Sequence, residues 1–309
     1  MQVHYDIEQL PRFRQAVVTI GTFDGVHLGH RQIIEKMKAE AAVTGGETVI
    51  ITFHPHPRKV VSSEFMGVRL ITTIQERITL LRATGIDHLV IVPFTDVFAN
   101  QSALEYIRDF LVKKFSPHTI IIGFDHRFGR DRLGNYQLME ELAPVYGYRL
   151  LEIPKHVLEN NSISSTLIRK AILQNDIDTA NKLLGHHFFF CGTVVHGDKI
   201  GRKLGYPTAN LKIEEEDKII PANGIYAVYA WPSGTEEPFK GMMSIGFRPT
   251  VDGKKRVVEV NIFDFNREIY GETLRVAVKK YLRPEWKFDS LDALIEQIGK
   301  DKVNSLAVL

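Results

Sequence analysis

The sequence contains little cysteine, little tryptophan and almost no excess of charge of either sign. Its single cysteine, Cys191, excludes an intramolecular disulfide and fits a reducing compartment. Cys191 falls in an apolar, strand-like run, so we interpret it as a buried structural thiol. The net charge is +2, from 39 basic and 37 acidic residues. This balance argues against nucleic acid or a membrane surface as a partner.

The sequence also lacks an apolar run long enough to span a bilayer, and residues 1–6 (MQVHYD) do not begin a signal peptide. We therefore expect a soluble cytoplasmic protein. Its 44% hydrophobic and 25% charged residues are those of an ordinary globular protein. The length of 309 residues suggests about two domains and leaves the oligomeric state open.

The N-terminal half alternates between short apolar strands and amphipathic helices. This alternation predicts a parallel sheet with helices on both faces. The predicted strands are 16–22, 48–53, 88–92, 119–123 and 148–153, and the predicted helices are 28–43, 73–83, 102–115 and 135–146. Two short helices, 166–174 and 177–184, are expected to close this half. Ligands should bind in the loops that follow the strands, at the carboxyl edge of the sheet.

The C-terminal half changes to closely spaced strands separated by turn signals. The predicted strands are 188–195, 225–231, 240–245, 257–263 and 273–282. Strands without intervening helices indicate a compact barrel. A final helix is expected over 290–299, with a serine N-cap and a glycine at its end. The boundary between the halves is expected near residues 185–187.

One segment, 21–30 (GTFDGVHLGH), directly follows an apolar strand and precedes a helix. A strand, a glycine-bearing turn and a helix can direct backbone N–H groups at a phosphate. His27 and His30 are three residues apart and share one face of the first helical turn. Gly29 between them leaves space for a nucleotide beside the backbone. The alternative is a simple strand–loop–helix corner with incidental histidines.

Three further loops follow the predicted strands or precede a helix. The loop 123–132 combines a carboxylate, arginines and aromatic residues, which suits a flat heteroaromatic ligand that carries phosphate; a solvated charged loop is the alternative. In 163–169 (ISSTLIR), the hydroxyls are either helix caps or, with Arg169, ligands of a triphosphate. The prolines of 54–57 (HPHP) favour a shaped substrate loop over a zinc site.

Together these loops indicate nucleotidyl transfer, which needs a positioned triphosphate rather than a protein nucleophile. His27, His30 and Arg169 are suited to neutralising the charge that develops on the phosphates. We expect Mg²⁺ to bind the phosphates as well.

The most informative segment of the second half is 197–210 (GDKIGRKLGYPTAN). Its glycines permit a backbone nest for an anion. Thr208 and Asn210 alternate along an extended segment, and their oxygens are hard ligands for Mg²⁺. A glycine-rich hairpin with surface lysines is the alternative. Glu259 lies inside an apolar strand and either faces solvent or accepts a proton from a hydroxyl that attacks a γ-phosphate. Periodicity does not decide between these two positions.

These motifs resemble the bifunctional bacterial riboflavin kinase/FAD synthetase family from near the start of the chain to near its end. The N-terminal half is similar to the nucleotidyltransferase module of that family at 21–30, 53–57, 123–129 and 163–169. The C-terminal half is similar to the riboflavin kinase module at 195–211, 224–226, 244–250, Glu259, 270–274, 281–284 and 288–291. The chain departs from the family pattern at Thr22, where many members carry asparagine, and at His54, which is often acidic.

The resemblance implies an α/β Rossmann-like nucleotidyltransferase domain with a parallel sheet (1–185). A compact antiparallel β-barrel riboflavin kinase domain with a C-terminal helix (186–309) follows. The resemblance also implies phosphorylation of riboflavin to FMN at the barrel and adenylation of FMN to FAD, with release of pyrophosphate, at the α/β domain. The implied partners are riboflavin, FMN and ATP, with Mg²⁺ as cofactor.

Residue roles follow from the same resemblance. The implied catalytic residues are His27, His30 and Arg169 for adenylation and Glu259 as general base on the ribityl 5′-hydroxyl. The implied ATP contacts are Gly21, Phe23, Asp24, Gly29, Ser164, Ser165, Thr166, Gly197, Lys199, Gly201, Gly205 and Pro207. The implied flavin contacts are His56, Pro57, Asp125, Phe128 and Arg275, and the implied metal ligands are Thr208 and Asn210.

Two other functions are compatible with parts of the sequence. One is a single-activity adenylyltransferase whose barrel only binds flavin, and the other is a non-catalytic flavin carrier. Thr208, Asn210 and Glu259 argue against the first alternative. The His27/His30 pair and the 207–210 segment argue against the second.

Overall fold

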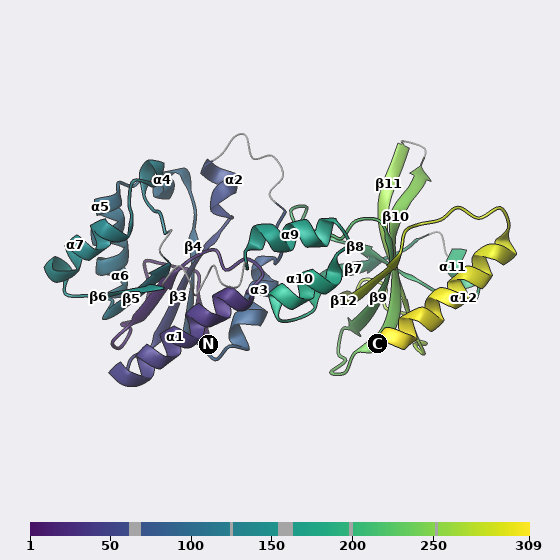
Figure 1. Cartoon of the computed structure of the whole chain (residues 1–309), viewed down its shortest axis with the longest axis horizontal. Helices are drawn as coiled ribbons and strands as arrows, with labels where there is room; N and C mark the ends of the chain where they lie inside the picture. Colours follow the sequence, from purple (N-terminus) through teal and green to yellow (C-terminus); the bar gives the residue numbers. More distant parts are fainter. Residues whose placement is uncertain (62–68, 124–125, 154–162, 198–199, 251–252) are drawn as a thin grey trace. The chain divides into compact units, whose positions relative to one another are not determined.

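The computed structural model describes residues 1–61, 69–123, 126–153, 163–197, 200–250 and 253–309. The chain forms two compact units, residues 1–165 and 166–309. Each unit has its own sheet (Figure 1). The predicted order, a parallel α/β unit and then an antiparallel barrel with a C-terminal helix, is confirmed.

The second unit includes two helices that precede the barrel. These are α9 (Ser165–Leu173) and α10 (Ile177–Leu184). Helix α10 packs against the barrel, where the Asn181 side chain donates to the Val278 carbonyl at 3.0 Å and accepts from the Phe188 amide at 2.7 Å. An amphipathic pattern predicts that a helix buries one face but does not say which sheet covers it.

The first unit contains a six-stranded parallel sheet in the order β1-β4-β3-β2-β5-β6. Its strands are β1 (Gln2–His4), β2 (Val17–Ile20), β3 (Thr48–His54), β4 (His88–Pro93), β5 (Thr119–Gly123) and β6 (Arg149–Ile153). The short edge strand β1 was not predicted. After β2, the chain adds β3 and β4 on one side of that strand and then β5 and β6 on its other side. Ligands bind at such a point of reversal, so the loops after β2 and β5 are well placed for a site.

Helices cover both faces of this sheet. The described helical segments of the first unit are α1 (Leu28–Thr44), α2 (Pro57–Val61), α3 (Ile74–Arg82), α4 (Asp96–Ala99), α5 (Ala103–Glu105), η1 (Tyr106–Val112), α6 (Lys113–Phe115), η2 (Arg130–Arg132) and α7 (Tyr136–Tyr146). The helix predicted over 102–115 is present as α5, η1 and α6, and its middle seven residues form a π-helix. Alternate residues of the strands pack into two separate hydrophobic clusters, one on each face of the sheet. Val17 and Ile50 pack toward α1 and α3, and Val18 and Ile51 pack toward η1 and α7.

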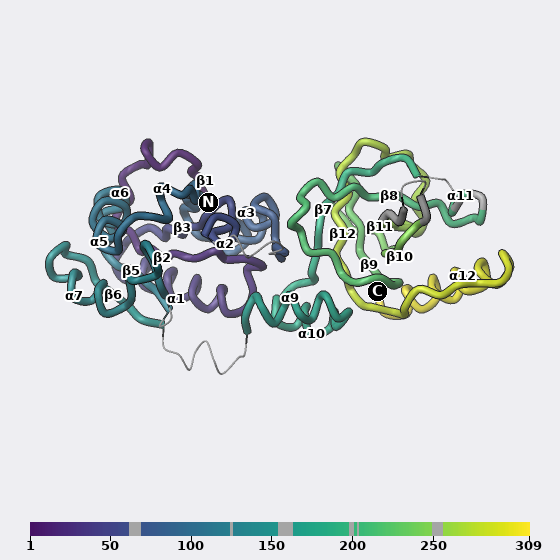
Figure 2. Tube along the Cα trace, turned by 90° about the horizontal axis from the view of Figure 1, so that it is seen from above, coloured from purple at the N-terminus to yellow at the C-terminus, as the bar shows by residue number. Residues whose placement is uncertain are grey.

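The second unit is a closed antiparallel barrel in the order β10-β11-β8-β7-β12-β9 (Figure 2). Its elements are β7 (Phe188–Val195), α11 (Ile200–Lys203), β8 (Ala209–Lys212), β9 (Gly224–Pro232), β10 (Phe239–Thr250), β11 (Gly253–Ile262), β12 (Thr273–Arg283) and α12 (Leu291–Val308). Helix α12 packs on β9, β10 and β12. Every helix in the described ranges is too short or too polar to cross a bilayer.

The C-terminal helix differs from its prediction. Ser290 is the N-cap as expected and accepts from the Ala293 amide at 3.2 Å. Gly299 does not end the helix, which continues for nine more residues to Val308. Beyond this glycine, the helix buries the side chains of Asp301 and Ser305, and this packing outweighs the low helix propensity of one glycine.

Candidate active sites

A tight turn joins β2 to α1 at the carboxyl edge of the parallel sheet. Phe23, Gly25 and Val26 have left-handed backbone, with φ of 48°, 87° and 42°. This conformation is costly for phenylalanine and valine, so the surrounding structure must enforce it. Phe23 is buried, and Gly21 leaves room for its ring, because a Cβ at Gly21 would lie 3.2 Å from that ring. The packing fixes the shape of the turn from which α1 begins.

His27 and His30 are brought together by this turn, as their spacing predicts. Nδ1 of His27 caps α1 by accepting from the His30 amide at 3.4 Å. The two rings stack with centres 3.6 Å apart and 17° between their planes. A Cβ on Gly29 would lie 3.2 Å from the His27 ring nitrogen, so glycine gives that ring its space. Nδ1 of His30 is buried and has no hydrogen-bond partner among the described residues.

The surroundings of His30 favour a neutral ring. Burial lowers the pKa of His30 well below its ordinary value, and the neighbouring His27 and Arg77 lower it further. An anionic phosphate beside the ring would act in the opposite direction, because negative charge stabilises the imidazolium form. His30 is therefore uncharged in the free protein, and a bound anion would raise its pKa.

Asp24 has a different position from the one expected for a phosphate contact. Its carboxylate is fully buried and accepts from the backbone amides of Ile71 and Thr72 at 3.1 and 2.9 Å. It also lies 3.9 Å from the buried guanidinium of Arg77. Thr72 Oγ1 donates to Asp24 and accepts from the Gly25 amide. Asp24 therefore ties the turn to the segment before α3, and its part in ATP binding stays a prediction.

The segment before α9 also meets the turn. Ser165 Oγ donates to the Asp24 carbonyl at 3.0 Å, and the Ile163 carbonyl lies near Gly29. Ser164 is exposed beside them. Thr166 and Arg169 follow in α9, within the second unit, and their part in the first site stays a prediction.

Two of the flavin contacts expected in the first unit, His56 and Phe128, are buried in this structure. His56 is buried, and its Nδ1 accepts from the Arg58 amide at 3.2 Å. Pro57 is the first residue of α2, a position that suits proline. Phe128 is buried and stacks on Tyr106 with ring centres 4.9 Å apart, and its contact with flavin stays a prediction. Asp125 lies outside the described residues.

In the second unit, three polar residues form one rung across β10, β11 and β8. Glu259 lies opposite Ser244 on one side and opposite Asn210 on the other. Directly opposed residues share a face of the sheet. The flanking Val258 and Val260 are buried in the barrel core, so Glu259 faces away from that core.

The face that carries Glu259 is not open solvent, because it lines a cavity of about 290 Å³. We call this the larger cavity. Glu259, Ser244, Thr208 and Arg248 line it from the strands. Its other wall comes from β12, the segment after it and α12, through Arg283, Trp286, Leu294, Ile298 and Asp301. The structure therefore places Glu259 beside a cavity that the sequence alone did not reveal.

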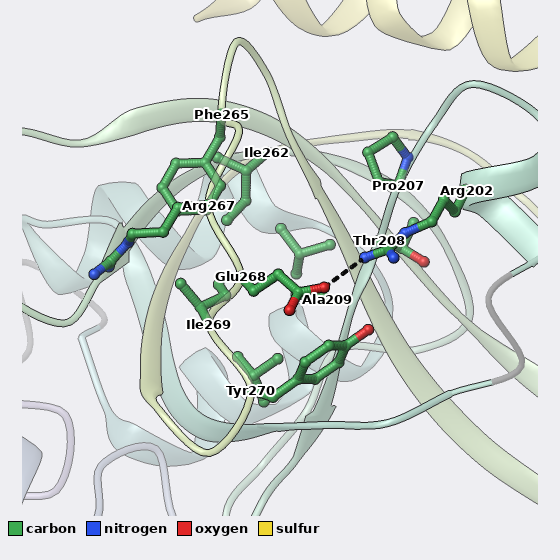
Figure 3. A pocket seen from close by; sticks show the side chains of 12 residues that line it. Arg202, Pro207, Thr208, Ala209, Ile262, Phe265, Arg267, Glu268, Ile269 and Tyr270 are labelled. Carbon is green, nitrogen blue, oxygen red and sulfur yellow. Dashed lines mark hydrogen bonds and ion pairs between the residues drawn. The ribbon is translucent and has the colours of Figure 1, made fainter.

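A second space of about 80 Å³, which we call the smaller cavity, lies on the other side of Thr208. Figure 3 shows Tyr270, Phe265 and Arg267 around it, with Arg202 and Glu268 joined by an ion pair of 3.4 Å. The Tyr270 ring also stacks on His196 with centres 4.0 Å apart. Thr208 lines both cavities, so it stands where they meet.

The glycine-rich segment packs on the two candidate metal ligands. A Cβ at Gly197 would collide with the Asn210 side chain, and a Cβ at Gly201 would lie 3.3 Å from Thr208 Oγ1. Gly205 has a φ of 83°, which favours glycine. Pro207 lines the smaller cavity, and its carbonyl accepts from the Asn261 side chain. Lys199 lies outside the described residues.

Arg275 is not brought to either cavity. Its neighbours Leu274 and Val276 point into the barrel core, so Arg275 points outward. Its guanidinium lies over the rings of Phe189 and Trp231, at 4.3 and 5.0 Å from their centres. Arg275 therefore packs on the outer wall of the barrel, and its contact with flavin stays a prediction.

Sequence reasoning missed four charged residues of the larger cavity, which are Arg248, Arg283, Glu285 and Asp301. Arg248 forms an ion pair with Glu259, and Arg283 forms two hydrogen bonds with Asp301 at 2.8 and 2.6 Å. Arg248 and Arg283 fall within segments 244–250 and 281–284, which carried the resemblance. The partnerships themselves join separate elements, so spacing gave no signal for them.

Comparison with known proteins gives two adjoining matches. Residues 10–167 match the family model described as FAD synthetase, and residues 184–309 match the model described as riboflavin kinase. The first match contains the β2–α1 turn with His27 and His30, and the second contains the barrel.

Curated relatives match over nearly their whole length. Proteins named bifunctional riboflavin kinase/FMN adenylyltransferase are 40% identical in Buchnera aphidicola, over 93% of this chain and 91% of the relative, and 36% identical in Bacillus subtilis, over 94% and 92%. The Escherichia coli K12 protein of that name is 34% identical over 97% and 95%. A crystal structure named as a macrolide-efflux protein from Streptococcus pneumoniae superposes with a TM-score of 0.87 at 32% identity, over 98% of each chain.

Proposed function

The chain belongs to the family of bifunctional riboflavin kinase/FMN adenylyltransferases, and from this premise we propose which residues carry its two reactions. The C-terminal barrel phosphorylates riboflavin to FMN with ATP. The N-terminal α/β unit adenylates FMN to FAD and releases pyrophosphate. The observation that supports our assignment best is the rung of Ser244, Glu259 and Asn210 beside the larger cavity.

In the kinase reaction, riboflavin occupies the larger cavity, whose wall includes Trp286 and aliphatic residues of α12. The adenine of ATP occupies the smaller cavity beside Tyr270 and Phe265. Thr208 lines both, so the γ-phosphate lies near it. Glu259 accepts the proton of the 5′-hydroxyl while that oxygen attacks the γ-phosphorus and ADP leaves.

The polar oxygens in this region fit Mg²⁺. Thr208 offers a hydroxyl and Asn210 an amide oxygen, and both are hard ligands. The described residues contain no cluster of three His, Cys, Asp or Glu side chains that could hold a metal ion. We therefore assign Thr208 and Asn210 to a metal that the nucleotide phosphates help to hold. When bound, Mg²⁺ neutralises the charge on the transferring phosphoryl group.

In the adenylation reaction, the His27/His30 pair and the amides at the start of α1 contact the ATP phosphates. An FMN phosphate oxygen attacks the α-phosphorus, and the bond to pyrophosphate breaks. His30 and Arg169 stabilise the charge of the leaving group. Ser165 and Asp24 hold the shape of the turn, and we assign the hydroxyls of Ser164 and Thr166 to the ATP phosphates as further donors.

The whole assignment is tested by one incubation. Purified protein is mixed with riboflavin, ATP and Mg²⁺, and the flavins are separated by chromatography over time. FMN should form first and then be converted to FAD. FMN without FAD contradicts the bifunctional assignment, and the absence of any product favours a flavin carrier.

We also infer a cytoplasmic location. The single cysteine supports this inference because the chain cannot form an intramolecular disulfide. Cell fractionation with antibody detection tests the location, and recovery of the protein outside the cytoplasmic fraction contradicts it.

A further inference from the structure

Glu259 forms an ion pair with Arg248, through Oε1 of the carboxylate and Nη2 of the guanidinium. Both side chains line the larger cavity and remain partly accessible, at 16% and 27%. Arg248 lies on β10, four residues after Ser244, which is the register partner of Glu259. An even separation along a strand keeps Arg248 on the same face as Ser244. The guanidinium therefore approaches the carboxylate from the cavity side of the neighbouring strand.

The other charges of this cavity have separate partners. Arg283 is paired with Asp301 of α12, and these side chains are only 11% and 3% exposed. Glu285 lies over Gly246 and accepts from the Asn223 side chain at 3.2 Å. Among the described charged residues that line the cavity, Arg248 is the cation in contact with Glu259.

We propose that Arg248 is a positioning residue of the kinase reaction, which holds the Glu259 carboxylate in the orientation that accepts the 5′-hydroxyl proton of riboflavin. This inference rests on the proposed role of Glu259 as general base. A carboxylate rotates readily about its last side-chain bond, and a planar guanidinium restricts that rotation. A misplacement of about 1 Å at a reacting group costs up to roughly a hundredfold in rate.

A direct role for Arg248 is the competing explanation. A cation that lines the cavity is also suited to contact a phosphate of ATP or of the product FMN. The two roles differ in their dependence on Glu259. A residue that acts through Glu259 loses its effect once the carboxylate is gone, whereas a phosphate contact contributes independently.

The test is a double-mutant cycle on the full chain with Arg248→Gln, Glu259→Gln and the double variant, with Arg248→Lys added. FMN formation is measured at steady state and in single turnover with enzyme in excess. Arg248→Gln should lower kcat by about 10- to 100-fold and leave the KM values for riboflavin and ATP within about threefold. Arg248→Lys should recover part of that loss. In the Glu259→Gln background, Arg248→Gln should change the rate by less than about threefold.

The same chain supplies the folding control, because FAD formation from supplied FMN uses the other unit. A matched control is Arg149→Gln, which breaks the Arg149–Glu40 ion pair of 2.6 Å in the first unit and should leave FMN formation unchanged. If Arg248→Gln also loses FAD formation, the variant is misfolded, and Arg248→Lys is used in its place.

Two results overturn the positioning role and leave the base assignment intact. One is a raised KM for ATP with unchanged kcat in Arg248→Gln. The other is a double variant whose fold loss in rate equals the product of the losses of Arg248→Gln and Glu259→Gln. Full FMN formation by Glu259→Gln instead overturns the proposed base itself, and the positioning role with it.

Discussion

Nδ1 of His27 accepts a hydrogen bond from the backbone amide of His30, and the two imidazole rings stack with their centres 3.6 Å apart. His27 therefore caps helix α1, and His30 lies in the first turn of that helix. Removal of either ring changes the environment of its neighbour, so the pair acts as one structural unit in the adenylation site.

His30→Ala should selectively impair FAD formation. The substitution removes a group assigned to the ATP phosphates, and loss of one such stabilising contact costs about 100- to 1000-fold in kcat. FMN formation from riboflavin should stay unchanged, because the kinase residues lie in the other unit. Both products are measured by chromatography. His118→Asn, just before β5 at its amino end, serves as the matched control, and equal loss in both variants contradicts the assignment.

The first unit should lose stability as the pH falls. Folding lowers the pKa of His30 below its ordinary 6.5, so below that pH the unfolded chain binds a proton that the folded chain resists. Thermal unfolding followed by circular dichroism should therefore show a melting temperature that decreases from about pH 6.5 downward. His30→Gln should flatten this decrease. Part of the slope should remain, because burial also lowers the pKa of His4 in the same unit; an unchanged slope contradicts the prediction.

Thr208→Val should weaken the use of Mg²⁺ by the kinase. Valine keeps the shape of threonine but removes the hydroxyl assigned to the metal. The Mg²⁺ concentration for half-maximal FMN formation should rise about tenfold, by analogy with the weaker binding of a site that loses one oxygen ligand. The Mg²⁺ dependence of FAD formation from supplied FMN is the internal control. Identical shifts in both reactions argue against a ligand role for Thr208.

Gly201→Ala should raise the KM for ATP in FMN formation. A Cβ at this position would collide with the backbone carbonyl of Tyr206, which has no rotamer by which to move away. The segment must shift beside Thr208, and such a displacement should raise KM by about tenfold. Gly234→Asn is the control, since that turn is open and asparagine tolerates its φ of 79°. Unchanged KM in Gly201→Ala would separate this segment from ATP binding.

Asp301→Ala should destabilise the barrel unit. The change leaves the nearly buried Arg283 guanidinium without its counter-charge, which costs about 3–5 kcal/mol in the free energy of unfolding. Urea denaturation followed by circular dichroism measures the loss. Lys300→Ala is the comparison, because its ion pair with Glu296 is exposed on the same helix and should hardly change stability. Equal stability of the two variants would show that α12 is held by other contacts.

Hydrophobic patterning predicted most of the fold because the strands of the first unit are continuous apolar runs and those of the barrel are separated by turn residues. It missed β1, which has only three residues and therefore too short a pattern. It placed the end of the last helix at Gly299, because local propensity does not include the tertiary packing of Asp301. The patterning likewise did not show that α10 packs on the barrel.

The candidate sites were only partly predictable. Glycine and histidine spacing located the turn at 21–30 and the segment at 197–210, because those motifs require a particular backbone. The burial of Asp24 and Phe128 was not predicted, since it depends on elements far along the chain. The partners of Glu259 and Arg283 lie 11 and 18 residues away on other elements, and the register that joins them exists only in the folded barrel.

The chain has two tryptophans, Trp231 and Trp286, and both belong to the barrel unit. Trp286 is 53% exposed at the wall of the larger cavity, with the Arg283 guanidinium 4.6 Å from its ring centre. Indole emission overlaps the absorption of oxidised flavins. The tryptophan fluorescence of this protein therefore comes from the barrel unit alone, so that the binding of riboflavin to that unit can be timed without any attached dye.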